Sequence, residues 1–288
     1  MVKSVKASGE ARIVSHLFKS DFYEIKNWTL NGDCSTSFET EYNDCFCAVH
    51  VNRGTLTKNM YALDSGRVTL EVPHFEYQLL PSTGSCTIIN FTDQFYSAAR
   101  EEFGIDKNFN RHGKRLIAVN APASPEAEFV LRQLLSELAN GRGSMQTDGL
   151  IMDFFTELVQ TTWTSGTTSH FHRSTNTHHQ DAIENAKEFL QSNFTRAISL
   201  ADLSRHCGVS LFYLSRLFKQ YTTYSPHQYL SSIRLKHGQM LLKDTALSVV
   251  DVSYASGFTS PEYFSTLFRL KYGLPPGTYR KERWKSFH

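Results

Sequence analysis

The chain has 288 residues, enough for two domains with separate hydrophobic cores. Its formal net charge is +2, but residues 181–288 hold 14 basic and 8 acidic residues, so they carry +6 while residues 1–180 carry −4. Contact with nucleic acid is therefore expected at the C-terminal end only. The odd number of five cysteines, together with the lack of a signal peptide or an 18-residue apolar run, argues against a secreted or membrane protein and favours the cytoplasm.

Residues from about 20 to 96 are predicted to form β-strands. Short runs of β-branched, aromatic and aliphatic residues alternate there with Gly, Pro and Asn, which is typical of a small barrel or sandwich. A ligand would then lie in the interior among aromatic side chains, with Phe46, Phe75, Tyr77 and Phe91 as candidates. A small barrel can equally fill its interior with its own side chains, so a ligand site and a filled interior both remain open.

Cysteine and histidine spacing in the N-terminal half gives no metal or redox motif. Cys45 and Cys47 are one residue closer together than Cys-x-x-Cys requires, so we interpret them as packing residues. Residues 164–180 are poor in large apolar side chains and rich in Ser, Thr and His, which predicts an interdomain linker at 166–180. Its histidines are expected to be solvated. We therefore predict no metal, no cofactor and no catalytic residue.

Two amphipathic helices are predicted between the strands and the linker, over about 125–163. At 125–139 leucines recur at positions i, i+3, i+4 and i+7, and at 149–163 large apolar residues follow the same spacing. Such a stripe packs either against the chain's own core or against a second copy in a homodimer, and the spacing fits both.

Residues 200–219 contain a helix-turn-helix pattern. Ser199 is placed to cap the first helix, Gly208 suits the left-handed residue that ends it, and Ser210 suits the N-cap of the next helix. The second helix has a buried stripe formed by Leu214, Leu217, Phe218 and Tyr221. Its opposite face carries Phe212, Ser215, Arg216 and Lys219.

The same pattern occurs again about 50 residues later. Asp202 and Gly208 are matched by Asp251 and Gly257, each 49 residues on, after which the offset is 50 because the second turn has one extra residue. A duplicated unit of this kind can place two similar helices in successive DNA grooves.

A long helix is predicted between the two copies. Ser225 as N-cap and Pro226 as the first helical residue begin it, and it runs to about Leu242. Its length of about 27 Å, at 1.5 Å per residue, approaches the roughly 34 Å of one DNA turn. Arg234 on this helix is predicted to pair internally, with Asp251 as its partner.

Residues 181–285 resemble the DNA-binding domain of the AraC/XylS family of bacterial transcription regulators. The residues that carry the resemblance are the run 208–219, the segment 225–230, the pair Arg234-Leu235 and the end of the second copy at 273–280. The chain departs from the family pattern at four positions. These are Ser204 and Ser253, where alanine is usual, Thr223, where glycine is usual, and Thr266, where many members have arginine.

The resemblance implies sequence-specific binding to double-stranded DNA, an activating role and contact with RNA polymerase. By position, it assigns DNA contacts to Phe212, Ser215, Arg216 and Lys219 in the first copy, and to Glu262, Ser265, Thr266 and Arg269 in the second. Arg216 can bind a guanine in bidentate fashion and Lys219 a phosphate. Thr266 lacks the forked donors of arginine, so a weaker second contact is expected.

The run from Arg53 to Phe91 resembles, more loosely, the cupin-like sensor barrel that precedes this domain in many AraC relatives. Metal-dependent cupins use clustered histidines and a glutamate, whereas His50 and His74 stand apart here, so we predict a barrel without metal. The predicted fold is α+β with two domains. Residues 1–165 form the cupin-like barrel with flanking helices, and residues 181–288 form an all-α domain with two helix-turn-helix motifs joined by a long helix.

Three functions follow from these observations. The first is a regulator whose N-terminal domain senses a small molecule, dimerises or does both; the second is a regulator controlled by a protein partner. The third, a cupin-type enzyme fused to DNA-binding helices, is disfavoured because no histidine-carboxylate group is present in the barrel region. The first two differ in whether the barrel interior is a lined cavity or is filled.

Overall fold

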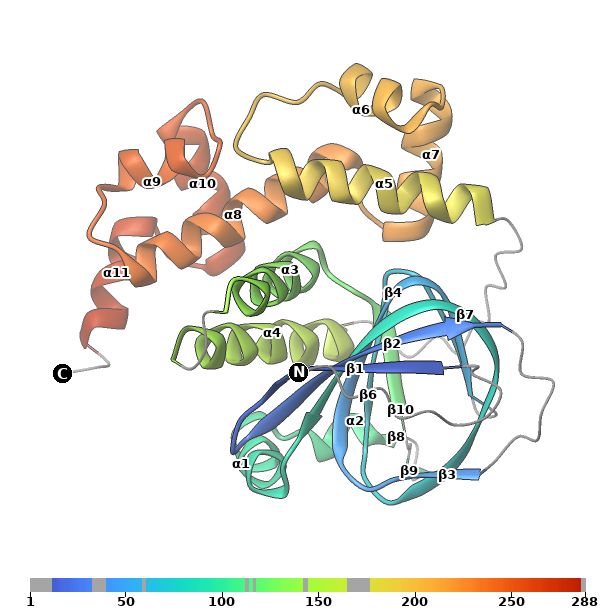
Figure 1. The fold of residues 1–288 in the computed structure, drawn as a ribbon. Coiled ribbons are helices and arrows are strands. Elements are labelled where there is room, and N and C mark those ends of the chain that lie inside the picture. The colour runs from blue at the N-terminus through green and yellow to red at the C-terminus, as the bar shows by residue number, and fades with distance from the viewer. Residues whose placement is uncertain are drawn as a thin grey trace. The chain divides into compact units, whose positions relative to one another are not determined.

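The computed structural model describes residues 12–32, 40–58, 61–111, 114–115, 118–141, 145–164 and 177–285. The chain divides into two compact units, Met1–Glu184 and Asn185–His288. The first unit is an antiparallel sheet with helices against it, and the second is helical (Figure 1). The boundary falls within helix α5 (Thr177–Asn193), so the last four residues of the predicted linker are helical; its other residues lie outside the described ranges.

The sheet of the first unit has eight antiparallel strands. Six of them follow the order β1-β2-β7-β4-β6-β10, while β3 pairs with β7 and β5 pairs with β4. The short strands β8 and β9 pair only with each other. The strands are β1 (Arg12–Lys19), β2 (Tyr23–Asn31), β3 (Thr40–Asn43), β4 (Phe46–Lys58), β5 (Tyr61–Asp64), β6 (Arg67–Glu71), β7 (Phe75–Phe91), β8 (Asn110–Arg111), β9 (Lys114–Arg115) and β10 (Ala118–Pro122).

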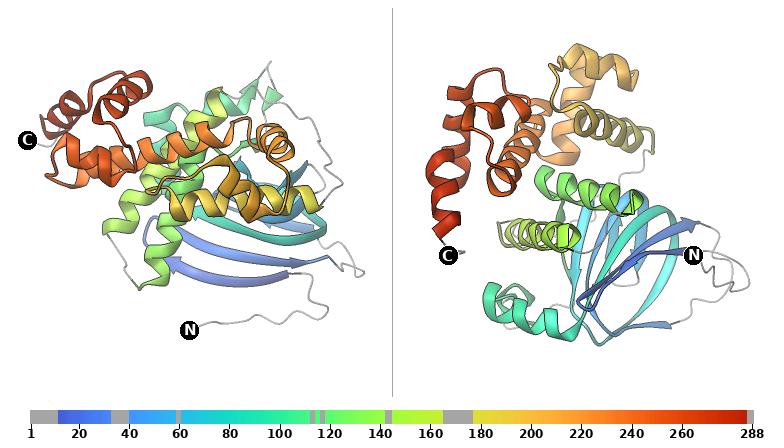
Figure 2. Two further views of the ribbon diagram at one scale, coloured as in Figure 1. Left: turned by 90° about the horizontal axis from the view of Figure 1, so that it is seen from above. Right: turned by 60° about the vertical axis from the view of Figure 1, so that its left-hand side comes forward.

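The sheet is curved, and apolar residues cover both of its faces (Figure 2). Strand β4 shows why, because residues 46–51 are all buried and successive side chains point to opposite faces. Phe46 and Ala48 belong to a core shared with the helices, whereas Val49 and Val51 belong to a second core on the other face. A sheet buried on both faces explains the continuous apolar run in β4.

The helices of the first unit begin earlier than the sequence analysis placed them. The predicted strand region was expected to reach residue 96, but the last long strand ends at Phe91 and α1 (Asp93–Phe103) follows, capped by the Thr92 hydroxyl. Helix α2 (Asp106–Phe109) is a single turn. Helix α3 (Pro125–Ala139) coincides with its predicted range, and α4 (Met145–Thr164) begins four residues before the predicted start. Strand β1 was not predicted.

The second unit consists of helices arranged about one long member, α8 (Pro226–Asp244). In Figure 1, α6 and α7 lie over one end of α8, and α9, α10 and α11 lie around the other end. The remaining helices are α6 (Leu200–Cys207), α7 (Leu211–Thr222), α9 (Val249–Ala255), α10 (Pro261–Tyr272) and α11 (Pro276–Lys285).

Each half of α8 contributes to a different hydrophobic core. Its N-terminal half buries Tyr229, whose ring packs edge-on against Phe218 of α7 at 5.3 Å between centroids. Its C-terminal half buries Leu235 and Leu242 in a cluster with Phe264, Phe268 and other residues of α9 and α10. One helix therefore supports both helix pairs. No helix in the described ranges combines the length and apolar character that crossing a bilayer requires.

Candidate nucleic-acid interface

The first helix pair, α6 and α7, begins and ends at the residues predicted from the sequence. The Ser199 hydroxyl accepts a hydrogen bond from the backbone N–H of Asp202, whose carboxylate in turn accepts from Ser199, so both groups of a capping box are present. Gly208 ends α6 with a left-handed φ of 65°, and the Ser210 hydroxyl caps α7. The turn is therefore specified by local hydrogen bonds and by one glycine.

Helix α7 buries one face and presents the other to solvent. Leu214, Leu217 and Phe218 are buried, whereas Arg216 and Lys219 are exposed and Ser215 is half-buried. Phe212 is 89% exposed, although a phenylalanine loses favourable burial by standing in water. The Arg216 guanidinium lies 5.7 Å from the centroid of the Tyr213 ring. All four residues predicted to contact DNA thus lie on or beside the open face of α7.

The second pair, α9 and α10, repeats this local structure. Ser248 caps α9 by accepting from the N–H of Asp251, and Ser260 caps α10 by accepting from the N–H of Tyr263. Phe264 and Phe268 are buried at the positions that correspond to Leu214 and Phe218.

The open face of α10 differs chemically from that of α7. The Ser260 hydroxyl donates to the Glu262 carboxylate at 2.7 Å, and this hydrogen bond lowers the pKa of Glu262. The Thr266 hydroxyl donates at 2.9 Å to the backbone oxygen of Glu262. Two of the four predicted contact residues are therefore engaged within α10, which leaves half-buried Ser265 and exposed Arg269.

A glutamine-tyrosine pair extends the repeat to α5, α8 and α11, which the sequence pattern did not include. Gln191 of α5 donates through Nε2 to the Tyr229 hydroxyl of α8 at 2.6 Å. Gln239 of α8 donates in the same way to the Tyr279 hydroxyl of α11 at 3.0 Å. Tyr229 and Tyr279 are 50 residues apart, an offset found in the sequence, but their glutamine partners are 48 residues apart, outside the 49- and 50-residue offsets. Helices α5–α8 and α8–α11 are hence two copies of one arrangement that share α8.

Arg234 has a structural role, but its predicted partner was wrong. Its Nε donates to the backbone oxygen of Phe194 and its Nη2 to that of Arg196, both at 2.7 Å. Asp251 instead accepts from the Ser248 hydroxyl at the start of α9. The guanidinium therefore binds the carbonyl groups just after α5, where the negative end of a helix dipole favours a cation.

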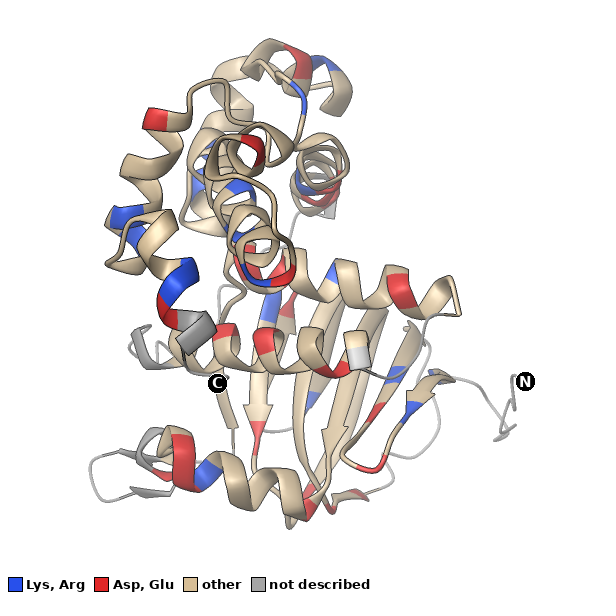
Figure 3. Ribbon diagram, turned by 90° about the vertical axis from the view of Figure 1, so that its left-hand side faces the viewer, with Lys and Arg blue, Asp and Glu red and all other residues tan. Residues whose placement is uncertain are grey.

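Basic and acidic residues are interspersed over the helices of the second unit (Figure 3). The exposed basic residues Arg216 and Lys219 lie on α7, and Arg269 lies on α10. Asp202 on α6 forms an exposed ion pair with Arg205 at 3.3 Å. Positive charge is thus present on the open faces of both helices.

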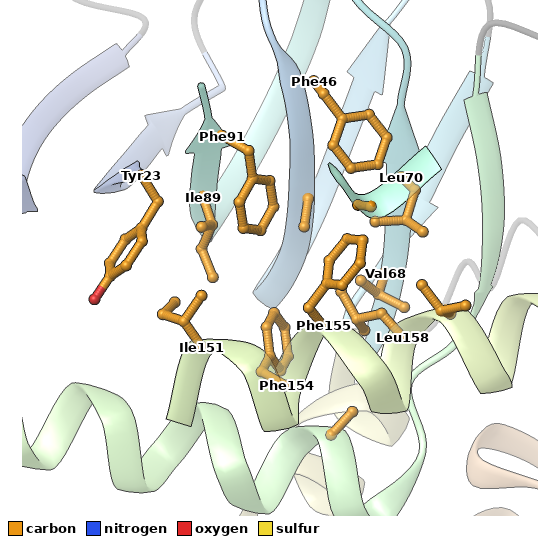
Figure 4. Packing of buried hydrophobic residues seen from close by; sticks show 14 of the residues in the cluster. Tyr23, Phe46, Val68, Leu70, Ile89, Phe91, Ile151, Phe154, Phe155 and Leu158 are labelled. Atoms are coloured by element: carbon orange, nitrogen blue, oxygen red, sulfur yellow. The ribbon is translucent and has the colours of Figure 1, made fainter. Parts of the chain in front are cut away.

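The four residues predicted to line a ligand site do not come together. Phe46 and Phe91 point into the core between the sheet and α4, where both contact Phe155 edge-on (Figure 4). Phe75 and Tyr77 lie near the N-terminal end of β7 with their ring centroids 6.0 Å apart. Since Phe46 and Phe91 are packed core residues, only Phe75 and Tyr77 stay candidates for contact with a ligand.

Phe75 and Tyr77 lie beside a buried ion pair formed by Lys58 and Glu71. Lys58 Nζ lies 2.9 and 2.8 Å from the two carboxylate oxygens of Glu71, and both side chains are almost fully buried. The ammonium also lies 4.0 Å from the Tyr77 ring centroid, and the Tyr61 hydroxyl donates to Glu71. Lys58, Glu71, Tyr61 and Tyr77 thus form one buried polar cluster in this part of the first unit.

Cys45 and Cys47 are free thiols, and the Cys47 thiol donates to the Glu71 carboxylate. Burial raises the pKa of Cys45 to about 12, and burial together with the nearby Glu71 carboxylate raises that of Cys47 well above its usual value. A protonated thiol is a poor metal ligand and nucleophile. Within the described ranges, no three His, Cys, Asp or Glu side chains gather in a way that could hold a metal ion.

Two capped helix pairs, each with a buried stripe and one face open to solvent, form the local structure of a helix-turn-helix domain. Residues 203–282 match the family model described as a helix-turn-helix domain. The chain carries the DNA-binding domain of the AraC/XylS family of transcription regulators.

Named relatives match the same part of the chain. The regulator GbdR of Pseudomonas aeruginosa is 33% identical over 97 residues, which are 34% of this chain and 26% of that protein. The melibiose operon regulatory protein of Escherichia coli is 29% identical over 115 residues, 40% of this chain and 38% of that protein. A solved AraC-type transcriptional regulator from Chromobacterium violaceum has 32% identity, covering 38% of this chain and 96% of that one, with a TM-score of 0.35. The chain thus spans about a quarter to two fifths of these curated relatives.

Proposed function

We propose that this protein is a sequence-specific regulator of transcription that inserts α7 and α10 into successive major grooves of one DNA duplex. The observation that carries the proposal is the open face of α7, where Phe212, Arg216 and Lys219 are exposed over a fully buried stripe. Helix α8, which carries the two pairs at its two ends, is about 28 Å long, and this length suits grooves roughly 34 Å apart if the DNA bends slightly toward the protein.

The roles of the side chains follow from their chemistry. Arg216 offers a planar fork to the O6 and N7 atoms of guanine, and Phe212 offers an apolar ring to a thymine methyl group. Lys219, farther along α7, binds a phosphate and sets the register without selecting a base. Ser215 can contact either a base or a phosphate.

The second pair makes fewer contacts with bases. Ser265 and Arg269 are the residues of α10 that remain available, because Glu262 and Thr266 are hydrogen-bonded within the helix. Glu262 would also repel phosphate unless it accepts from a cytosine amino group.

Selection of duplexes from a random library by the full chain tests the proposal. Enrichment of a two-part site about one helical turn long, with affinity that falls steeply as salt rises, is the expected result. A variant lacking both Arg216 and Lys219 side chains is the control. Failure to enrich any sequence, or equal binding by the control, would contradict the proposal.

We further propose that the first unit regulates this binding. A small-molecule effector is supported by the loose resemblance of residues 53–91 to sensor barrels, and Phe75 and Tyr77 are the aromatic side chains that would contact it. Control by a protein partner is the alternative, since the buried Lys58–Glu71 pair occupies part of this region. A thermal-shift screen of metabolites against the full chain distinguishes the two: a ligand that binds the folded state raises Tm.

Dimerisation through the first unit is a separate proposal. Apolar stripes on α3 and α4 support it, although several of their residues already pack against the sheet. A dimer binds paired sites more tightly by raising effective concentration. Activation, with contact to RNA polymerase, is carried over from the family resemblance, and transcription in vitro from a promoter with the selected site tests it.

A further inference from the structure

The two copies of the repeat also contact each other where the segment after α5 meets α8 and the α9–α10 turn. This junction is formed by Phe194 and Arg196 after α5, by Arg234 and His237 on α8, and by Ser256 and Gly257 at the α9–α10 turn. Helix α5 belongs to the first copy of the repeat, and the α9–α10 turn belongs to the second. The junction therefore joins the copies without passing along the long axis of α8.

Arg234 occupies the centre of the junction. It lies on α8 between Ile233, which is fully buried, and Leu235, which belongs to the core of the second pair. Its two hydrogen bonds of 2.7 Å hold the backbone after α5 against the middle of α8. Because the guanidinium is planar and forked, it fixes the direction as well as the distance of this segment.

Gly257 brings the second pair onto the same segment. A Cβ atom there would lie 2.6 Å from the Phe194 oxygen, 2.8 Å from Thr195 Cα and 2.9 Å from Arg234 Nε. Gly257 also has a φ of 84°, a backbone conformation that is strained for any residue with a Cβ atom. The backbone of the second turn therefore rests directly on the segment that Arg234 holds.

His237 extends the contact by one helical turn. Its ring packs edge-on against Phe194 at 4.9 Å, and its Nδ1 lies 3.4 Å from the hydroxyl of buried Ser256. Arg234 and His237 of α8 and the two flanking segments thus form one continuous packed region.

A contact between the two copies at the middle of α8 matters because α8 is long, so that a small change of its direction moves its far end by several ångströms. A helix of about 28 Å that tilts by about 7° displaces its far end by about 3.4 Å, the rise of one base pair. Helices curve and bend when nothing braces them. The junction at the middle of α8 would limit changes in the distance between α7 and α10 to less than the rise of one base pair.

We propose that Arg234 is a positioning residue that sets the spacing between the two DNA segments that the protein accepts. It acts by clamping the end of α5, and through it the α9–α10 turn, onto α8. This inference rests on the proposed function, since it concerns how two recognition helices address one duplex.

Binding to duplexes of altered spacing tests the inference. The probes are the two-part site selected by the full chain and the same site with one base pair inserted or deleted between its halves. The intact protein should lose about tenfold or more in affinity on each altered duplex, the order of a mismatched base pair. Arg234→Met should bind the original site more weakly, but its loss on the altered duplexes should shrink to about threefold or less.

Arg280→Met is the matched control. The Arg280 Nε also donates to a carbonyl at a helix end, that of Leu242 at 3.3 Å, but this contact lies within the second copy. It should lower Tm and leave the spacing penalty unchanged. A spacing penalty equal in Arg234→Met, Arg280→Met and the intact protein would overturn the positioning role and leave Arg234 a purely structural residue. Arg234→Lys, which can reach one carbonyl but not both, should be intermediate; it replaces the methionine variant if that one does not fold.

A measurement without DNA separates the two proposals. Spin labels attached through p-acetylphenylalanine at exposed Gln220 and Leu270, on α7 and α10, report the distance between the pairs. We expect a narrow distribution in the intact protein and in Arg280→Met, and a broader one in Arg234→Met or Arg234→Lys. Distance distributions of equal width in the intact protein and in the Arg234 variants would overturn the proposed role of Arg234, even if the protein binds DNA. Failure to select any duplex, with widths as expected, would overturn the DNA-binding function and leave the clamp intact.

Discussion

Thr223 and Gly273 end equivalent helices, α7 and α10, with the same left-handed backbone, at φ values of 66° and 79°. A β-branched residue is costly in this conformation, whereas glycine adopts it readily. The first copy therefore carries backbone strain that the second copy does not.

Thr223→Gly is accordingly expected to stabilise the protein. Relief of the left-handed strain, about 1–2 kcal/mol, outweighs the added freedom of glycine in the unfolded chain, about 0.5–1 kcal/mol. Denaturant unfolding should show a gain of about 0.5–1 kcal/mol. Thr222→Gly is the control: that residue is helical and buried, so the same change should destabilise.

Arg216→Ala and Lys219→Ala should differ in specificity. Loss of a bidentate guanine contact costs about 1–3 kcal/mol on the selected site and relaxes preference at one base pair, whereas loss of a phosphate contact weakens all sequences alike. Titration of the selected and a scrambled duplex measures both. Equal losses on the two duplexes for Arg216→Ala would rule out base recognition by this residue.

The half-site under α7 should contribute more to specificity than the half-site under α10. Thr266 and Glu262 are hydrogen-bonded within α10, whereas Arg216 on α7 is exposed. Competition with duplexes randomised in one half at a time should therefore show a larger loss for the α7 half. The opposite ranking would mean that α10 rearranges on binding.

Lys58→Met should strongly destabilise the first unit. It leaves the Glu71 carboxylate buried without its counter-ion, which costs about 3–5 kcal/mol. The double change Lys58→Met with Glu71→Gln removes the unpaired charge and should recover part of the loss in thermal unfolding. A double variant less stable than Lys58→Met alone would show that Glu71 is stabilised mainly by Tyr61 and other donors.

His237 should make stability depend on mildly acidic pH. Burial lowers its pKa in the folded protein below the usual value of about 6.5, so the folded state favours the neutral ring. Its contribution is then complete above about pH 6.5 and is lost as pH falls through the lower folded-state pKa. Between pH 7.5 and 5, Tm of His237→Gln should fall less than Tm of the intact protein.

The sequence predicted the C-terminal helices well because their signals are local. Ser199, Gly208 and Ser210 act through hydrogen bonds and backbone conformation within a few residues, and the structure places each at the predicted helix end. The partner of Arg234 was wrong because it is a backbone carbonyl 40 residues away, which no side-chain pattern encodes. The role of Glu262 could not be predicted either. Its side-chain rotamer decides whether its carboxylate is available to DNA or accepts a hydrogen bond from Ser260, and the sequence does not specify the rotamer.

The N-terminal unit was harder to predict for a related reason. Its sheet is apolar on both faces, so Phe46 and Phe75 look alike in the sequence although they belong to different regions. Which aromatic rings face the helices depends on strand register, and a shift of one residue exchanges the faces. Helix α1 was missed because its start follows a long buried strand directly.

The sharing of α8 by two cores also bears on how the chain folds as it is synthesised. Tyr229 can complete the first core once the N-terminal half of α8 has emerged, because its partner Phe218 precedes it. Leu235 and Leu242 must wait for Phe264 and Phe268, which emerge later. During translation the apolar face formed by Leu235 and Leu242 is therefore exposed to solvent until α10 has been synthesised. A chain truncated near residue 245 would keep this face exposed and would be prone to aggregate.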